Sequence, residues 1–114
     1  MSKRILSVSY DQNLLTTRGL LLQREGYEVC SAFGFTEAMA RCGSGSFDLF
    51  IIGHSIPHTD KEELIKAFRS KSKAPVLSLN RPGEKTVDHA EYHAFPDDPL
   101  EFINMVERIL KNGD

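Results

Sequence analysis

Short apolar runs alternate along this chain with longer segments that mix apolar and polar residues. Residues 49–52 form a wholly apolar, partly β-branched run with a turn on either side. A strand without polar alternation is covered on both faces, so this run predicts a buried central strand of a parallel sheet between helices. Similar runs predict four more strands, at residues 5–8, 27–32, 76–79 and 91–95.

The amphipathic segments between these runs predict helices. The first begins after Asp11, a residue type that caps helix N-termini, and ends at Gly26, which supplies a left-handed stop. Its apolar residues recur at helical spacing, and Arg18 is expected to face solvent. Three further helices are expected: one that ends at Cys42, one capped at Thr59 that runs to about residue 70, and one that opens at Pro99.

The connection between the last two predicted strands is less regular. Arg81, Pro82 and Gly83 break regular structure. Residues 84–90 are too polar and too few for more than a turn or two of helix, with Val87 as the apolar anchor. This connection predicts a shortened fourth helix among the five.

Strands that alternate with helices predict an α/β fold. Right-handed crossovers then give a flavodoxin-like, doubly wound (βα)5 three-layer sandwich whose five-stranded parallel sheet has the order 2-1-3-4-5. With 114 residues, of which 40% are apolar, the chain is long enough for one core and too short for two. We expect a single domain over residues 1–114.

Composition narrows the function classes. The net charge is −2 and no basic block stands out, which argues against direct nucleic-acid binding. Too few apolar residues precede Asp11 for a signal peptide, and no segment approaches the length of a membrane span, so we expect a cytoplasmic location and no membrane partner. Cys30 and Cys42 lack a Cys-x-x-Cys spacing and are expected to be reduced packing residues.

Reactive groups in open α/β sheets collect beyond the carboxyl ends of the strands, and there the central strand is followed by Gly53. Glycine brings no carboxylate, hydroxyl, thiol or amine. His54 and Ser55 follow it in the same chemically favoured place. The pairs His54/His58 and His89/His93 are four residues apart, yet neither falls on one helix, so no metal site and no cofactor are predicted.

Five segments together resemble the receiver domain of bacterial response regulators over nearly the whole chain. They are RILSVSYDQNLL, LLLQREGYEVCSA, FDLFIIGHSIP, APVLSLN and EYHAFPDDPLEFINMVERIL. The most telling features are REGYEV at the end of the first helix, a proline four residues after Gly53, PV at the start of the fourth strand, and an aromatic residue three positions before an X-Pro pair.

The resemblance implies a degenerate phosphorylation site. Receivers take a phosphoryl group on an aspartate where this chain has Gly53, and they hold Mg²⁺ through two acids where it has Ser9 and Tyr10. The hydroxyl residue that normally follows the phosphoryl oxygen is replaced by Asn80, and the lysine that pairs with it by Phe95. A glycine cannot form an acyl phosphate, so the resemblance implies a member that lacks the phosphoacceptor.

Five residues in or near these positions carry further expectations. Asp11 could give a metal one oxygen, but its type and place favour a helix cap. Tyr92 matches the aromatic residue that changes rotamer with phosphorylation in receivers, and is expected to be a fixed surface aromatic, an interaction anchor. By resemblance, the peptide bond before Pro96 is expected to be cis. We also expect Tyr10 and Phe95 to plug the pocket and fix one conformation.

The expected function is a phosphorylation-independent, receiver-like signalling module of a two-component or phosphorelay system. It would act by binding a protein such as a histidine kinase, an output protein or a second copy of itself, and would not be an enzyme. The alternative is a small α/β enzyme or a nucleotide- or ligand-binding protein that uses Ser9, His54, Ser55 and Asn80 in the same crevice. No catalytic triad, P-loop or Gly-x-Gly-x-x-Gly pattern supports that alternative.

Overall fold

A five-stranded parallel sheet forms the centre of the protein in a computed structural model that describes residues 3–43, 46–87, 89–95 and 98–112. The strands lie in the order β2-β1-β3-β4-β5, which confirms the predicted order and the α/β fold class. Their bounds are β1 (Arg4–Ser9), β2 (Glu28–Phe33), β3 (Leu49–Ile52), β4 (Val76–Leu79) and β5 (Tyr92–Ala94).

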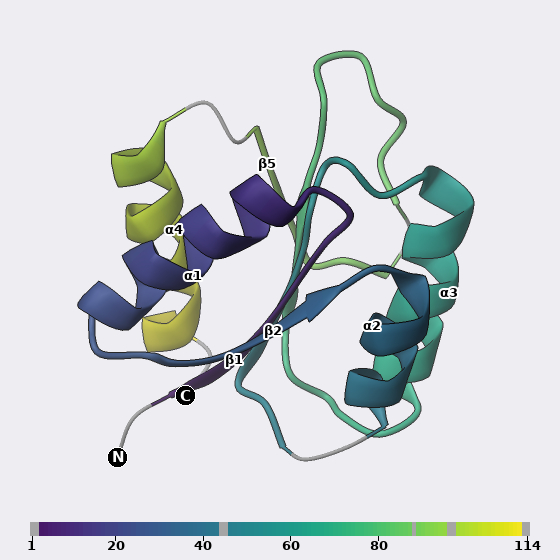
Figure 1. Cartoon of the computed structure of the whole chain (residues 1–114), viewed down its shortest axis with the longest axis horizontal. Coiled ribbons are helices and arrows are strands. Elements are labelled where there is room, and N and C mark those ends of the chain that lie inside the picture. Colours follow the sequence, from purple (N-terminus) through teal and green to yellow (C-terminus); the bar gives the residue numbers. More distant parts are fainter. Residues whose placement is uncertain (1–2, 44–45, 88, 96–97, 113–114) are drawn as a thin grey trace.

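Helices cover both faces of the sheet. In Figure 1, α1 (Gln12–Arg24) and α4 (Pro99–Asn112) lie on one face, and α2 (Phe35–Cys42) and α3 (His58–Arg69) lie on the other. None of the helices in the described ranges is both long enough and apolar enough to span a bilayer. Cys30 and Cys42 are both free thiols, as expected, and Cys42 is buried.

The central strand β3 is buried on both faces, as its unbroken apolar sequence predicts. Phe50 and Ile52 belong to the core cluster under α2 and α3. Leu49 and Ile51 point the other way, into the cluster under α1 and α4. This alternation fixes the register, because a shift of one residue would exchange the two faces.

The helix ends follow the sequence signals in three places and depart from them in one. Asp11 caps α1 by accepting a hydrogen bond from the Leu14 N–H, and Gly26 has a φ of 91°. Pro99 opens the last helix. The expected Thr59 cap is wrong, because α3 starts at His58, after Pro57, and no side chain caps it.

The connection from β4 to β5 contains no helix in its described residues, so the predicted short fourth helix is wrong and the layout has four helices in the described part of the chain. Gly83 and His89 have positive φ angles of 81° and 72°, which a right-handed helix excludes. The Glu84 carboxylate accepts a hydrogen bond from the Arg81 N–H, which closes a turn. Val87 is buried and anchors the connection, as predicted.

Candidate functional site

The carboxyl ends of β1, β3 and β4 meet at one edge of the sheet and bring Ser9, Gly53 and Asn80 into one crevice. Ser9 and Asn80 are almost fully buried, and Gly53 is buried between them. A Cβ atom built on Gly53 would stand 3.4 Å from Ser9 Oγ, 3.0 Å from the Val8 carbonyl oxygen and 3.0 Å from Arg18 Nη1. The crevice is therefore filled by its neighbours at the point where a side chain of residue 53 would begin.

Two serines tie the turn after β1 to the turn after β3. Ser9 Oγ lies 3.1 Å from Ser55 Oγ, and Ser55 Oγ accepts a hydrogen bond of 3.0 Å from the Tyr10 N–H. Ser9 Oγ also accepts from the Asp11 N–H, at 3.0 Å. Both hydroxyl groups are thus occupied by structural hydrogen bonds, and their neutral network needs no counter-charge.

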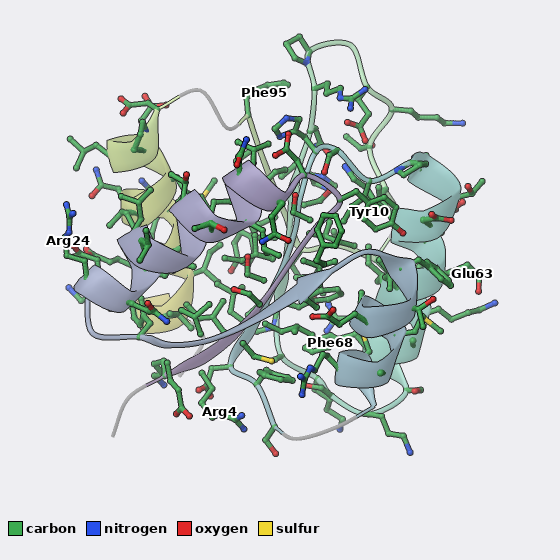
Figure 2. All side chains as sticks on the ribbon, in the orientation of Figure 1. Arg4, Tyr10, Arg24, Glu63, Phe68 and Phe95 are labelled. Carbon is green, nitrogen blue, oxygen red and sulfur yellow. The ribbon has the colours of Figure 1, made fainter. Side chains whose placement is uncertain are left out.

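The side chain of Tyr10 leaves the crevice sideways and packs against the core cluster under α2 and α3. Its hydroxyl donates a hydrogen bond of 2.9 Å to Asp60 on α3. Burial raises the pKa of the Tyr10 hydroxyl, and the Asp60 carboxylate raises it further. Phe95 is 57% exposed and lies apart from Tyr10 (Figure 2), so the expected plug made of these two rings is wrong.

Arg18 fills the crevice instead, contrary to the expectation that it faces solvent. Its side chain is only 6% exposed, and its guanidinium reaches from α1 toward Gly53. Arg18 Nη2 lies 3.1 Å from His54 Nδ1, and Nη1 has no hydrogen-bond partner among the described residues. Burial lowers the pKa of Arg18, and the Asp11 carboxylate opposes that effect. A guanidinium remains charged under these conditions, so the crevice carries a permanent cation.

Lys61 supplies a second cation from the first turns of α3. Its side chain is fully buried, and Nζ donates to the Leu79 carbonyl oxygen at 2.9 Å and to Asn80 Oδ1 at 3.2 Å. It also donates to Ser78 Oγ at 3.3 Å and to Glu84 Oε2 at 2.7 Å. Burial lowers the pKa of Lys61, and Glu84 partly offsets that shift. The lysine joins α3 to the end of β4 and to the loop beyond it.

His54 lies against this positive charge. Since an arginine can only donate, Nδ1 of His54 must accept from Arg18, and the imidazole proton then resides on Nε2. Burial lowers the pKa of His54, and Arg18, Arg81 and Lys61 lower it further, against a smaller opposite effect of Asp11. His54 is therefore a neutral N–H donor near pH 7.

The remaining expected site residues lie at the β5 side of the crevice. Asn80 Nδ2 lies 3.2 Å from His93 Nδ1, and the Asn80 N–H donates to the Ala94 carbonyl oxygen at 2.8 Å. Tyr92 is partly buried and packs against the core cluster under α1 and α4. The peptide bond before Pro96 lies outside the described residues.

Sequence reasoning missed Arg18 and Lys61, although helical spacing marks both. Arg18 lies three residues after Leu15 and four before Leu22, on the buried face of α1. Lys61 lies three, four and seven residues before Leu64, Ile65 and Phe68, and so on the buried face of α3. A charged residue at a helix position whose spacing places it among the buried apolar residues is the sequence signal that could have identified these two buried cations.

Curated sequences and solved structures resemble this chain over nearly its whole length. It is 26% identical over 117 residues to the transcriptional regulatory protein ResD of Bacillus subtilis, a match that covers 96% of the chain and 49% of that protein. It is 27% identical over 122 residues to the regulator PhoP of alkaline phosphatase synthesis in the same species, with 100% and 51% covered. The chain thus spans about half the length of these regulators. No protein-family model matches it.

The solved structures match over almost the whole chain. The response regulator TrrA of Thermotoga maritima, solved with Mg²⁺ and beryllofluoride, has a TM-score of 0.79 at 27% identity and covers 94% of the chain and 98% of its own. A CheY-like receiver domain of Methanospirillum hungatei has a TM-score of 0.84 at 23% identity, with 99% and 97% covered, and supports the fold. These similarities in sequence and fold support a response-regulator receiver domain of the CheY-like type. Such domains are signalling modules of two-component systems and not true enzymes.

The Mg²⁺ that receiver domains employ does not fit the residues present in this receiver domain. Mg²⁺ requires hard oxygen ligands, usually carboxylates. Ser9 and Tyr10 supply no carboxylate, and their hydroxyl groups are engaged with Ser55 and Asp60. Asp11 Oδ1 is engaged by the Leu14 N–H. The Arg18 guanidinium stands beside Gly53, where it would repel a divalent cation. Within the described ranges, no three His, Cys, Asp or Glu side chains gather at a possible metal site.

Proposed function

We propose that this receiver domain signals without phosphorylation, by binding a protein partner. One observation carries the proposal: the residue at the carboxyl end of the central strand β3 is Gly53, and the Arg18 guanidinium approaches the place where its side chain would begin. A backbone glycine offers no nucleophile for phosphoryl transfer.

The groups around Gly53 support the same proposal. At the positions that resemblance assigns to the acidic pair, Ser9 is occupied in hydrogen bonds within the turns and Tyr10 is bonded to α3. Asn80 stands at the hydroxyl position and is held by Lys61 and by β5. Phe95, at the lysine position, points to solvent and brings no cation.

Two buried cations take over the role of holding the crevice in one arrangement. Arg18 joins α1 to the turn after β3 through His54. Lys61 joins α3 to the end of β4 through three oxygen atoms, and to the loop beyond it through Glu84. In a switching receiver domain, charge at this crevice would be added and removed. Here the charge belongs to the chain, so a single conformation is favoured over an equilibrium between two.

The partner is expected to be a protein of a two-component pathway, such as a kinase or an output protein, or a second copy of this chain. The described part of the surface exposes large apolar side chains that could contribute to such a contact. They are Leu20, Phe33, Phe35, Phe95 and Leu100. Tyr92 is half-buried against α4 and would present a fixed ring.

Sedimentation velocity tests this function. The protein is run alone, with Mg²⁺ and inorganic phosphate, and with Mg²⁺ and acetyl phosphate, and a receiver domain that retains an aspartate at the end of β3 serves as control. We expect the sedimentation coefficient of this protein to be the same with acetyl phosphate as with inorganic phosphate. A change of association state seen only with acetyl phosphate would contradict the proposal.

A further inference from the structure

An open cleft lies beyond the carboxyl ends of β3 and β4, between the turn after β3 and the loop after β4. Its volume is about 550 Å³, which is within the usual range for small-molecule sites. The polar residues of its lining are His54, Ser55 and His58 on one side and Arg81 and Glu84 on the other. In Figure 1 the loop after β4 rises beyond the sheet. Its residues 81–84 line the cleft.

Positive charge surrounds this cleft. Arg81 is exposed, and among the described residues its guanidinium has neither a hydrogen bond nor an ion pair. Arg18 stands behind His54. The one carboxylate in the lining, Glu84, is neutralised: Oε2 accepts from Lys61 at 2.7 Å and Oε1 from the Arg81 N–H at 2.8 Å. An anion that enters the cleft would therefore meet attraction from Arg18 and Arg81 and little repulsion.

His54 adds a directed donor to this charge. The hydrogen bond from Arg18 to Nδ1 leaves the proton on Nε2, and in the described structure this nitrogen has no partner and is not among the buried unpartnered atoms. The imidazole lines the cleft on the side of the turn after β3, and Arg81 lines it on the side of the loop after β4. An N–H donor that is backed by a buried cation favours an acceptor with negative charge.

We propose that this cleft reversibly binds a small tetrahedral oxyanion of the phosphate type, held by the Arg81 guanidinium on one wall and by His54 Nε2–H on the other. A planar carboxylate can be satisfied by the guanidinium alone, whereas a tetrahedral anion has further oxygens for the opposite wall. The anion would be a free ligand, with no covalent bond to the chain and no metal. The inference rests on the proposed function, because Gly53 removes covalent attachment and leaves occupancy of the cleft as the signal.

Bound anion would join two segments that are separate in the chain. Arg81 belongs to the loop that leads to β5, and His54 to the turn that leads to α3. Occupancy would therefore restrain the β4–β5 connection, which lacks a helix in its described residues. Binding of the anion could in this way change the surface near β5 without phosphorylation.

A titration with inorganic phosphate, without Mg²⁺ and at constant ionic strength, tests the site by amide NMR. We expect saturable shifts of the amides of residues 54–55 and 81–84. Arg81→Ala should weaken binding about tenfold, since a charge-assisted hydrogen bond is lost. Lys66→Ala, which removes an exposed cation from α3, should leave the affinity unchanged. A parallel titration with acetate should give weaker binding.

Three results would overturn the proposal: shifts that do not saturate, an Arg81→Ala variant that binds as the parent does, or acetate that binds as tightly as phosphate. Inorganic phosphate cannot transfer a phosphoryl group under these conditions. Failure of this titration would therefore leave the claim of phosphorylation independence intact, and that claim is tested separately with a phosphoryl donor.

Discussion

Replacement of Gly53 by aspartate measures how closely the Arg18 cation approaches the end of the central strand. The new Cβ would stand 3.0 Å from the Val8 carbonyl oxygen, a backbone atom of β1 that would have to give way by a few tenths of an ångström. Such overpacking costs about 1–2 kcal/mol. The other contact, Arg18 Nη1 at 3.0 Å, is the far end of a flexible side chain and yields readily.

The carboxylate itself should pair with the guanidinium. With Arg18 present, a buried ion pair is close to neutral in free energy, so Gly53→Asp should cost about 1–2 kcal/mol in total. With Arg18→Met, the carboxylate is buried without a partner, and the same substitution should cost roughly 2–3 kcal/mol more. The double-mutant cycle should therefore give a coupling free energy of about 2 kcal/mol.

Urea unfolding of the four proteins at neutral pH gives this coupling. For a domain of this size, about 2 kcal/mol corresponds to a shift of roughly 1–2 M in the urea midpoint. The reasoning is refuted if Gly53→Asp costs the same in both backgrounds, within about 0.5 kcal/mol. That result would mean that Arg18 does not face the end of β3.

Three further predictions follow from the buried groups. Lys61→Met should lower the free energy of unfolding by about 3 kcal/mol, because the Glu84 carboxylate then loses its buried cationic partner. The control Lys66→Met, on the exposed face of α3, should change it by less than about 0.5 kcal/mol in the same urea assay. The folded pKa of His54 lies below its ordinary value of 6.5, so the contribution of the neutral imidazole to the free energy of unfolding is complete above pH 6.5 and declines as the pH falls toward the folded pKa. His54→Gln should flatten this decline in a series of urea unfolding curves at different pH. An unchanged slope would contradict this prediction. Burial raises the pKa of Cys42 to about 11, so iodoacetamide should not label it at pH 8 in the folded protein and should label it in urea.

The sheet was predictable because its strongest signal is local. The apolar run of β3 favours a short strand that is buried on both faces, and the alternation of strands and helices then predicts a doubly wound parallel sheet. Asp11 and Gly26 marked the ends of α1 for equally local reasons, a side-chain cap and a left-handed residue. These features need no information from distant parts of the chain.

The contents of the crevice depended on long-range contacts that type-based reasoning overlooked. Arg18 and Lys61 are charged, and charged residues usually face water. Their residue type therefore predicts exposure, although their positions on the apolar face of each helix predict burial. Burial is tolerated because each finds partners: His54 for the guanidinium, and Glu84 with three β4-side oxygens for the ammonium. The prediction for Phe95 was wrong in the opposite direction, because this apolar residue was expected to be buried in the pocket and is exposed.

The absence of a helix before β5 has the same origin. Glu84 to Ala90 had weak helix signals, and the tertiary pairing of Glu84 with Lys61 competes with any helix that would start there. At the C-terminal end of the same segment, the positive φ of His89 is incompatible with a right-handed helix. A weak local preference is easily overridden by one strong buried contact.

The central claim is that this crevice does not accept a phosphoryl group, and intact-mass spectrometry tests it most directly. The protein is incubated with Mg²⁺ and acetyl phosphate, next to a receiver domain that retains the aspartate. We predict that the control gains the mass of one phosphoryl group and that this protein keeps its unmodified mass. A hydroxylamine-labile phosphoryl adduct on this protein would contradict the account.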